Sequence, residues 1–163
     1  MKKWDGSFQL SSCVLSAKLL THHLTFANFH ISEYEPGPEG RSYKRYTQSV
    51  TWYEAKKICE NDGAILASDD ATNIHEYLKK RFGTGTFWIG ANDIKSENTY
   101  VWANNKPINV KYWGPNQPGG SGDPDCVRTN SDGVGRWNDA GCHEKHQFLC
   151  QKDSMLNYFT FTI

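Results

Sequence analysis

The 163-residue sequence has no Cys-x-x-Cys pair and no excess of charge of either sign. It also has no apolar run close to the roughly 20 residues that a membrane-spanning helix needs. The missing cysteine spacing argues against a zinc ribbon or a thioredoxin-like site. Basic and acidic residues number 18 each, so nothing favours nucleic acid or an anionic membrane surface as a partner. We therefore expect neither nucleic-acid binding nor membrane insertion.

The short motifs of common enzyme classes are missing as well. There is no Gly-x-Ser-x-Gly elbow, no His-Glu-x-x-His zinc motif and no glycine loop for phosphate. His143 and His146 lie three residues apart, but no third ligand follows at a suitable spacing, so we expect no zinc site. The sequence indicates a binding protein rather than an enzyme.

Aliphatic residues are scarce, and aromatic residues compensate for them. Hydrophobic residues make up 37% of the chain, but 6 Trp, 8 Tyr and 8 Phe bury a large area each. The length suits one globular domain with little room for a second. We expect Trp88, Trp102 and Trp137 in the core of that domain.

Five cysteines are present, and four of them lie among loops rich in glycine in the C-terminal two thirds of the chain. These four are Cys59, Cys126, Cys142 and Cys150. Such a set favours disulfides, and hence a secreted, extracellular protein. The sequence alone allows three pairings of the four. Cys13 is left over, either as a free thiol or as a link to a second chain in an oligomer.

A cluster of proline and glycine at 35–40 marks a domain boundary. We place an N-terminal segment of uncertain structure at 1–40, the folded domain at 41–152 and a C-terminal tail at 153–163. The first residues are charged, but polar side chains interrupt the apolar stretch that a signal peptide would have.

The folded domain is expected to begin with two helices. Thr51 and Glu54 have the spacing of a capping box, and Gly63 is a stop signal after one helix. Between them, apolar residues recur on one helical face at Trp52, Ala55, Ile58 and Cys59. Asp69 or Asp70 is expected to cap a second helix that runs through Phe82.

From residue 87 onward the pattern changes to short strands separated by Gly, Asn, Asp and Pro. The expected strands are 87–90, 100–102, 126–129, 136–137 and 147–151. The long stretch 112–125 has no regular pattern, and a loop of this length in a compact domain usually carries function. Two helices followed by short antiparallel strands predict an α+β fold.

Many of these positions match one family. The matching residues, in order, are 52–55, 59, 63–67, 88–90, 117–118, 126–127, 137–139, 142 and 148–150. In this set the sequence resembles the C-type lectin family, and its secreted invertebrate members of immune recognition in particular. The resemblance covers 41–152. It implies a C-type lectin-like fold with a long ligand-binding loop region and two disulfides, Cys59–Cys150 and Cys126–Cys142.

The resemblance also implies calcium as a cofactor. Its ligands would be Gln117, Asp123, Asn138 and Asp139, which offer the oxygen atoms that calcium prefers. In sugar-binding members of the family, one such calcium accepts two neighbouring hydroxyls of a sugar. This implies calcium-dependent binding of glycans. Gln117 at the first position of the loop triplet goes with galactose-type sugars rather than mannose-type ones.

Two departures from the family pattern leave an alternative open. Gly119 stands where the triplet has Asn or Asp, and Pro124 stands where an acidic ligand is usual, although Asp123 is adjacent. A second, weaker calcium site is implied at Asp93, Glu97 and Asp125. The alternative is a calcium-independent, protein-binding domain of the same fold, with a decayed sugar site and an extracellular protein as its partner. Trp113, beside the loop, is expected either in the core or stacked on a sugar.

Overall fold

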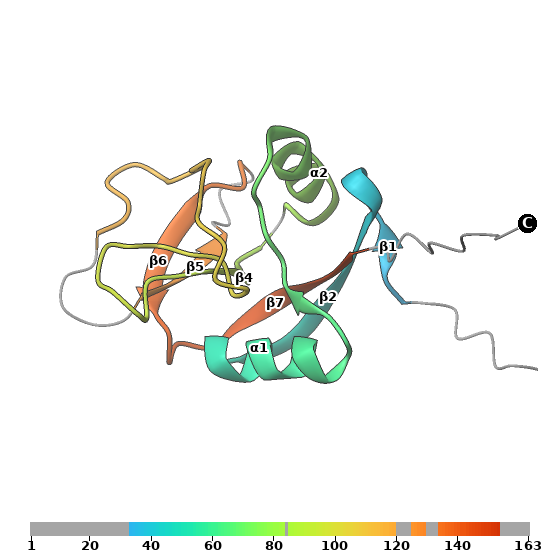
Figure 1. Cartoon of the computed structure of the whole chain (residues 1–163), viewed down its shortest axis with the longest axis horizontal. Helices are drawn as coiled ribbons and strands as arrows, with labels where there is room; N and C mark the ends of the chain where they lie inside the picture. Colours follow the sequence, from blue (N-terminus) through green and yellow to red (C-terminus); the bar gives the residue numbers. More distant parts are fainter. Residues whose placement is uncertain (1–32, 84, 120–124, 130–133, 154–163) are drawn as a thin grey trace, which may run out of the picture. The chain divides into compact units, whose positions relative to one another are not determined.

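The computed structural model describes residues 33–83, 85–119, 125–129 and 134–153 (Figure 1). The predicted ligand Asp123, its neighbour Pro124 and the unpaired Cys13 lie outside these residues. Neither helix in the described ranges has the length and apolar character needed to cross a membrane.

The first helix, α1 (Trp52–Asn61), forms as its sequence predicts. Oγ1 of Thr51 accepts a hydrogen bond from the Glu54 N–H, and the Glu54 carboxylate accepts one from the Thr51 N–H, which completes the capping box. Trp52, Ala55 and Cys59 are the buried residues of this helix. Gly63, with φ +63°, takes the left-handed conformation just beyond its end. Local sequence therefore fixes both the start and the end of α1.

The second helix, α2 (Thr72–Phe82), begins differently from the prediction. Its N-cap is Ala71, and no side chain caps it. Asp70 instead pairs with Arg41, whose Nη1 lies 2.5 Å from Oδ1 of Asp70. Asp69 is buried and contacts His75 and Trp137. The predicted cap was wrong because tertiary partners occupy both carboxylates.

The strands of the described part form one mixed sheet. Its strands are β1 (Glu35–Pro36), β2 (Arg41–Val50), β3 (Ile65–Leu66), β4 (Phe87–Asn92), β5 (Asp125–Thr129), β6 (Trp137–Gly141) and β7 (His146–Asp153). A 3-10 turn, η1 (Pro38–Gly40), joins β1 to β2. The order is β1-β2-β7-β4-β5-β6, and β3 pairs with β7. β1 and η1 thus belong to the segment 1–40 that the sequence placed before the domain.

One pairing differs from the expected antiparallel pattern. β4 and β7 run parallel, at Phe87–Gln147 and Trp88–Phe148, while the other strand pairs are antiparallel. Parallel neighbours need a long connection, and the whole loop region with β5 and β6 lies between these two strands. The expected strand 100–102 was wrong in extent, because only Val101 forms bridges there, to Asn92 and Pro107.

Two aromatic clusters fill the core, and both disulfides lie in one of them. Trp137 and Trp102 belong to one cluster, Trp88 to the other, and all three have exposed fractions of 2% or less. The disulfides are Cys59–Cys150 and Cys126–Cys142, with Cα–Cα distances of 5.5 and 5.0 Å. The first joins α1 to β7, and the second joins β5 to the turn after β6. The α+β class, the two helices and both disulfide pairings are confirmed.

Candidate functional site

The loop that carries Gln117 is attached to β6 directly before Asn138. The Trp137 N–H donates to the carbonyl of Tyr112 over 2.8 Å, and the Gly114 N–H donates to the carbonyl of Trp137 over 2.8 Å. The Gln117 N–H then donates to the Gly114 carbonyl at 3.1 Å, which turns the loop. The loop segment 112–117 and the start of β6, about twenty positions apart in sequence, therefore lie side by side.

Gly114 sits between the side chains of Gln117 and Asn138. A Cβ at this glycine would lie 3.1 Å from Oδ1 of Asn138 and 3.6 Å from Cγ of Gln117. Since 3.1 Å is shorter than carbon–oxygen contacts normally allow, a side chain here would push Asn138 away. The missing side chain lets both amides approach the same backbone segment.

Gln117, Gly119 and Asp139 contact one another through hydrogen bonds. The Asp139 N–H donates to Oε1 of Gln117 at 3.2 Å, and the Gly119 N–H donates to Oδ2 of Asp139 at 2.8 Å. Gly119 therefore reaches Asp139 through its backbone, at the position where the resemblance expected a side-chain ligand. The structure brings together three of the four residues predicted for the first calcium site, and the fourth, Asp123, lies outside the described residues.

Asn138 contributes an oxygen that lacks a donor. Its Oδ1 is buried, and within the part of the chain that the structure describes it accepts no hydrogen bond. A buried acceptor without a donor costs free energy, so such atoms are rare and usually have an explanation. Amide and carboxylate oxygens are the ligands that calcium prefers. The side-chain oxygens of Gln117, Asn138 and Asp139 are therefore of the type that calcium binds.

Amide oxygens are essential to that fit. In the described ranges, no three side chains of His, Cys, Asp or Glu come close enough together to hold a metal ion. A site at this place thus depends on Gln117 and Asn138 together with Asp139. The sequence could indicate these two amides only through the family resemblance, because isolated Asn and Gln residues are common in loops.

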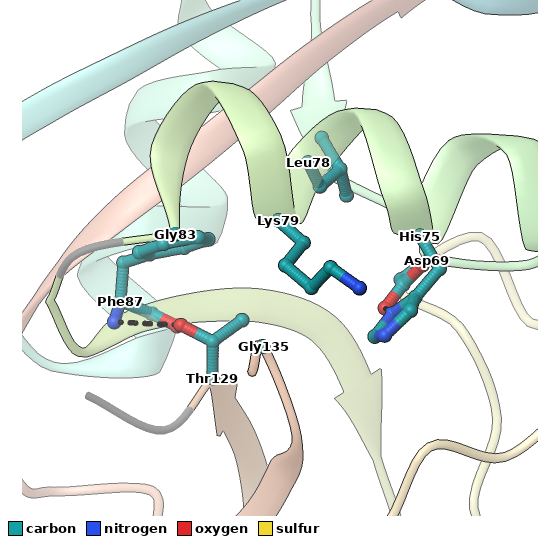
Figure 2. A pocket seen from close by; sticks show the side chains of 8 residues that line it. All are labelled: Asp69, His75, Leu78, Lys79, Gly83, Phe87, Thr129 and Gly135. Carbon is teal, nitrogen blue, oxygen red and sulfur yellow. Dashed lines mark hydrogen bonds and ion pairs between the residues drawn. The ribbon is translucent and has the colours of Figure 1, made fainter. Parts of the chain in front are cut away.

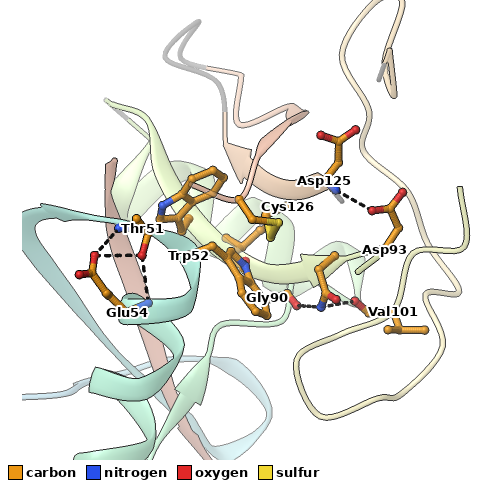
Figure 3. Close-up of a disulfide and its surroundings, with 12 residues drawn as sticks. Thr51, Trp52, Glu54, Gly90, Asp93, Val101, Asp125 and Cys126 are labelled. Carbon is orange, nitrogen blue, oxygen red and sulfur yellow. Dashed lines mark hydrogen bonds between the residues drawn. A yellow bond between two sulfur atoms is a disulfide. The ribbon is translucent and has the colours of Figure 1, made fainter. Parts of the chain in front are cut away.

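Asp93 and Asp125, predicted for the second calcium site, do meet (Figure 3). Oδ1 of Asp93 accepts from the Asp125 N–H at 2.8 Å, and Oδ2 of Asp93 accepts from the Asn98 N–H at 2.9 Å. Asp93 is 2% exposed, whereas Glu97 lies at the surface. Both oxygens of Asp93 thus stabilise the loop that follows β4.

Tyr100 connects the two predicted sets of acids. Burial raises the pKa of its hydroxyl above the ordinary value, and nearby carboxylates raise the pKa further. These carboxylates are Asp93, Asp139, Asp125 and Glu97. The Trp113 ring meets the Tyr100 ring edge-on, with centroids 4.9 Å apart, and is half-buried. Acids from both predicted sets therefore raise the pKa of one phenol, and Trp113 packs against its ring.

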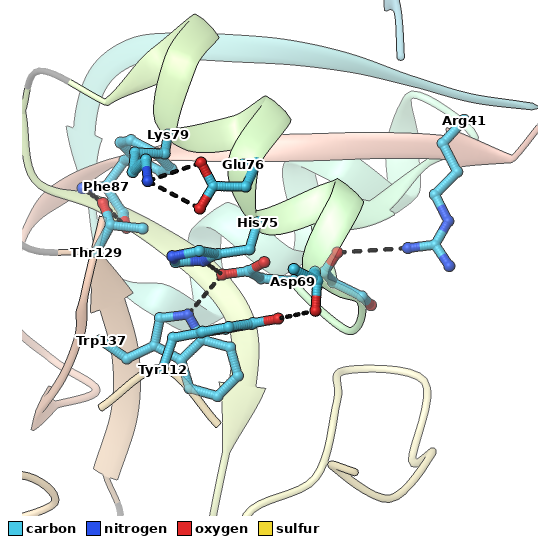
Figure 4. Close-up of polar contacts among 11 residues, drawn as sticks. Arg41, Asp69, His75, Glu76, Lys79, Phe87, Tyr112, Thr129 and Trp137 are labelled. Carbon is cyan, nitrogen blue, oxygen red and sulfur yellow. Dashed lines mark hydrogen bonds and ion pairs between the residues drawn. The ribbon is translucent and has the colours of Figure 1, made fainter. Parts of the chain in front are cut away.

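A polar cluster that the sequence did not reveal supports β6 from beneath α2 (Figure 4). Oδ2 of Asp69 accepts from Nε1 of Trp137 at 2.7 Å and lies 2.8 Å from Nδ1 of His75. The imidazole of His75 stacks on the Tyr112 ring, with centroids 3.7 Å apart. Burial raises the pKa of Asp69. The only sequence signal is a histidine on the buried face of α2, which did not single out its partners.

A small cavity of about 10 Å³ lies beside this cluster (Figure 2). Asp69 and His75 line one side of it, and Phe87 and Thr129 line another. The Phe87 N–H donates to Oγ1 of Thr129 at 3.3 Å and holds β4 against β5 there. The cavity thus lies between α2 and the sheet, and none of the residues that line it belongs to 117–119 or 138–139.

Sequence comparison identifies relatives of this chain. The chain matches the family described as the Lectin C-type domain over residues 48–152. It is 33% identical over 116 residues to Lectin BRA-3 of Megabalanus rosa, which covers 69% of this chain and 72% of that lectin. Some relatives are much longer, and the chain spans 30% of one human relative and 7% of another.

Solved structures share the fold. The mouse scavenger receptor C-type lectin carbohydrate-recognition domain has a TM-score of 0.68 at 25% identity, over 75% of this chain and 94% of that domain. A calcium-independent type II antifreeze protein has a TM-score of 0.69 at 24% identity, over 75% and 92%, which shows likeness of fold alone. Because the family model matches more than half of this chain, the chain belongs to the C-type lectin domain family.

Proposed function

We propose that this chain binds carbohydrate through a calcium ion held by Gln117, Asn138 and Asp139, together with Asp123. The observation that carries the proposal is the buried Oδ1 of Asn138, which has no donor among the described residues and, like the Gln117 side chain, lies next to Gly114. Its similarity to a lectin and to a carbohydrate-recognition domain supports the same function. On this proposal the chain is a binding protein rather than an enzyme.

Each side chain has a part in binding. Bound calcium would supply coordination positions for two neighbouring hydroxyls of a sugar. The amide of Gln117 and the carboxylate of Asp139 would hydrogen-bond the same hydroxyls, and bonds to the charged carboxylate are the stronger kind. The hydrogen bond between Gly119 and Asp139 orients that carboxylate before a ligand arrives.

A second, weaker calcium site is proposed at Asp93, Glu97 and Asp125. The Asp125 N–H donates to the Asp93 carboxylate. Glu97, like Asp93 and Asp125, raises the pKa of Tyr100. Because the backbone N–H groups of Asp125 and Asn98 occupy both oxygens of Asp93, a cation would have to share them. We expect affinity in the millimolar range of extracellular modules.

The proposed setting is extracellular recognition of glycans, those of microbes included. Two disulfides persist best in an oxidising compartment, which supports secretion. Gln117 favours galactose-type over mannose-type sugars on the family pattern. One such site binds a monosaccharide weakly, so several copies would be needed for useful avidity.

Affinity resins test the proposal directly. The oxidised chain is passed over galactose and mannose resins in calcium, and a chelator is then added. We expect retention on galactose resin, weaker retention on mannose resin and release by the chelator. Calorimetry should show heat of calcium uptake by the same protein. Flow-through on both resins, with no heat of calcium binding, would contradict the proposal.

One observation favours the alternative of calcium-independent protein binding. Oε1 of Gln117 and Oδ2 of Asp139 already accept backbone N–H groups, so these two oxygens are satisfied without a cation. On this alternative the chain passes through both resins and shows no signal on a glycan array. Its protein partner then binds equally well in calcium and in chelator.

A further inference from the structure

A groove lies between the first turn of α1 and the loop that follows β4. Its volume is about 390 Å³. Its walls come from α1, from Ile94 and Lys95, and from the segment 101–105. Figure 3 shows two of its lining residues, Trp52 on α1 and Val101 on the loop. None of the lining residues belongs to the proposed calcium sites.

The groove is mainly apolar. Trp52 and Trp102 form buried parts of its lining, each 2% exposed. At its rim lie Tyr53 and Ile94, which are 39% and 37% exposed. Among the described residues, large hydrophobic side chains are exposed at three positions, and these are two of them. Tyr53 and Ile94 thus offer apolar surface at the rim of one groove.

The charged residues of the groove carry one sign only. Lys56 and Lys95 line it, and none of the lining residues is acidic. Lys56 also contacts Glu60 one helical turn away, and Glu60 lies outside the lining. The remaining residues with polar side-chain groups are Asn92 and Asn105 with their amides, Tyr53 with its hydroxyl, and Trp52 and Trp102 with their indole N–H groups. An occupant with negative charge and an apolar body would complement both properties.

We propose that this groove binds a small organic anion with an aromatic body, of the arylalkyl carboxylate class. Lys56 and Lys95 hold the carboxylate, and the ring of the ligand packs against Tyr53 and Ile94. Ligand pockets for small molecules have volumes of about 300–1,000 Å³ and mostly apolar walls with a few polar groups, which describes this groove. The binding needs no calcium and is independent of the proposed sugar site.

Three matched probes test the roles of charge and ring. The whole oxidised chain, in chelator, is titrated with 4-phenylbutyrate, its neutral amide and 4-phenylbutylamine, and ligand-observed saturation-transfer NMR detects binding. We expect the carboxylate to bind most tightly, the amide less tightly and the amine not at all. Butyrate, which lacks the ring, should give no signal. Equal binding of all three aromatic probes, or binding of glucuronate in preference to phenylbutyrate, would overturn the proposal.

Variants then locate the site. The double variant Lys56→Gln with Lys95→Gln should weaken phenylbutyrate binding about three- to tenfold, since each exposed ion pair contributes less than about 1 kcal/mol. Ile94→Ser should weaken the carboxylate and the amide alike. Lys57→Gln, on the same helix but outside the groove, is the matched control and should change nothing. Equal loss in the control, or no loss in the double variant, would refute the assignment.

Discussion

The indole N–H of Trp137 donates to Oδ2 of Asp69 across 2.7 Å, with both residues buried. Trp137 directly precedes the Asn138–Asp139 pair on β6, and Asp69 lies just before α2. His75 holds the same carboxylate from within α2. The position of the proposed sugar-binding residues therefore depends on a polar contact that involves none of them.

The pH dependence of stability should report on this contact. Burial raises the pKa of Asp69 from its ordinary value of 3.8, so the folded chain holds this proton more tightly than the unfolded chain. The stability that protonated Asp69 contributes is complete below 3.8 and is lost as pH rises toward the raised pKa. In Asp69→Asn this titration is absent. The free energy of unfolding of the natural chain minus that of the variant should thus fall as pH rises above 3.8.

Urea unfolding of both chains at steps between about pH 3 and pH 7 measures this difference. The contributions of most other carboxylates are the same in both chains and cancel when the two free energies are subtracted. A difference that increases with pH would show instead that the pairing with His75 outweighs burial. The variant Trp137→Phe tests the same contact from the other side, because it removes the indole N–H and leaves the Asp69 carboxylate in place. It should destabilise the chain by about 1–3 kcal/mol through the loss of a donor to a buried acceptor.

The two disulfides should contribute unequally to stability. Their sequence separations are 91 for Cys59–Cys150 and 16 for Cys126–Cys142. Loop closure in the unfolded chain then predicts about 4.6 kcal/mol for the first and about 3 kcal/mol for the second. Replacing each pair by alanine and measuring urea midpoints tests the order. Equal losses, or a greater loss from the shorter loop, would contradict the entropic argument.

Asp93 should matter for folding even without calcium. Its carboxylate accepts two backbone N–H groups, from Asp125 and Asn98, and is almost fully buried. Asp93→Ala in chelator should therefore cost about 1–3 kcal/mol, because it leaves buried donors without an acceptor. Glu97→Gln at the surface of the same loop is the control and should stay within about 0.5 kcal/mol. Thermal unfolding followed by circular dichroism compares the two variants.

Asn138→Ala separates binding from stability. Because Oδ1 of Asn138 has no donor in the described structure, its removal in chelator should not lower the unfolding free energy. Calcium affinity should nevertheless fall by at least about tenfold, since even partners of metal ligands have effects of that size. Calorimetry with calcium and urea unfolding in chelator provide both values.

Asn109→Ala, an exposed amide elsewhere in the loop region, is the control for that variant. It should leave calcium uptake and stability as they are. If Asn138→Ala retains calcium affinity, the proposed site falls. If the variant instead loses stability in chelator, Asn138 has a structural role and its oxygen is not held for a ligand.

Local signals in the sequence predicted the elements that depend on local interactions. The capping box of Thr51 and Glu54 is one case, since both hydrogen bonds join residues three positions apart. The same reasoning failed at Asp69 and Asp70. An acidic residue before a helix often caps it, but here Arg41, His75 and Trp137 contact the two carboxylates. Arg41 and Trp137 lie 29 and 68 positions away from their partners, and no local pattern indicates such contacts.

The site was predictable to a similar degree. The resemblance predicted Gln117, Asn138 and Asp139 for one site, and the fold places these residues near one another, while their role as calcium ligands stays a prediction. It did not indicate that the Gly119 backbone would bind Asp139, since a glycine carries no side-chain signal. Nor did it reveal the groove beside α1, because Tyr53, Lys56 and Ile94 are ordinary residues until the fold places them around one space.

β6 is the last strand in the sheet order, so a single strand, β5, pairs with it, and the segment 112–114 covers its outer margin. Residues 138 and 139 therefore have a neighbouring strand on one side and loop segments on the other. Replacing the proposed calcium ligands at this margin would remove no strand and no disulfide from the centre of the sheet.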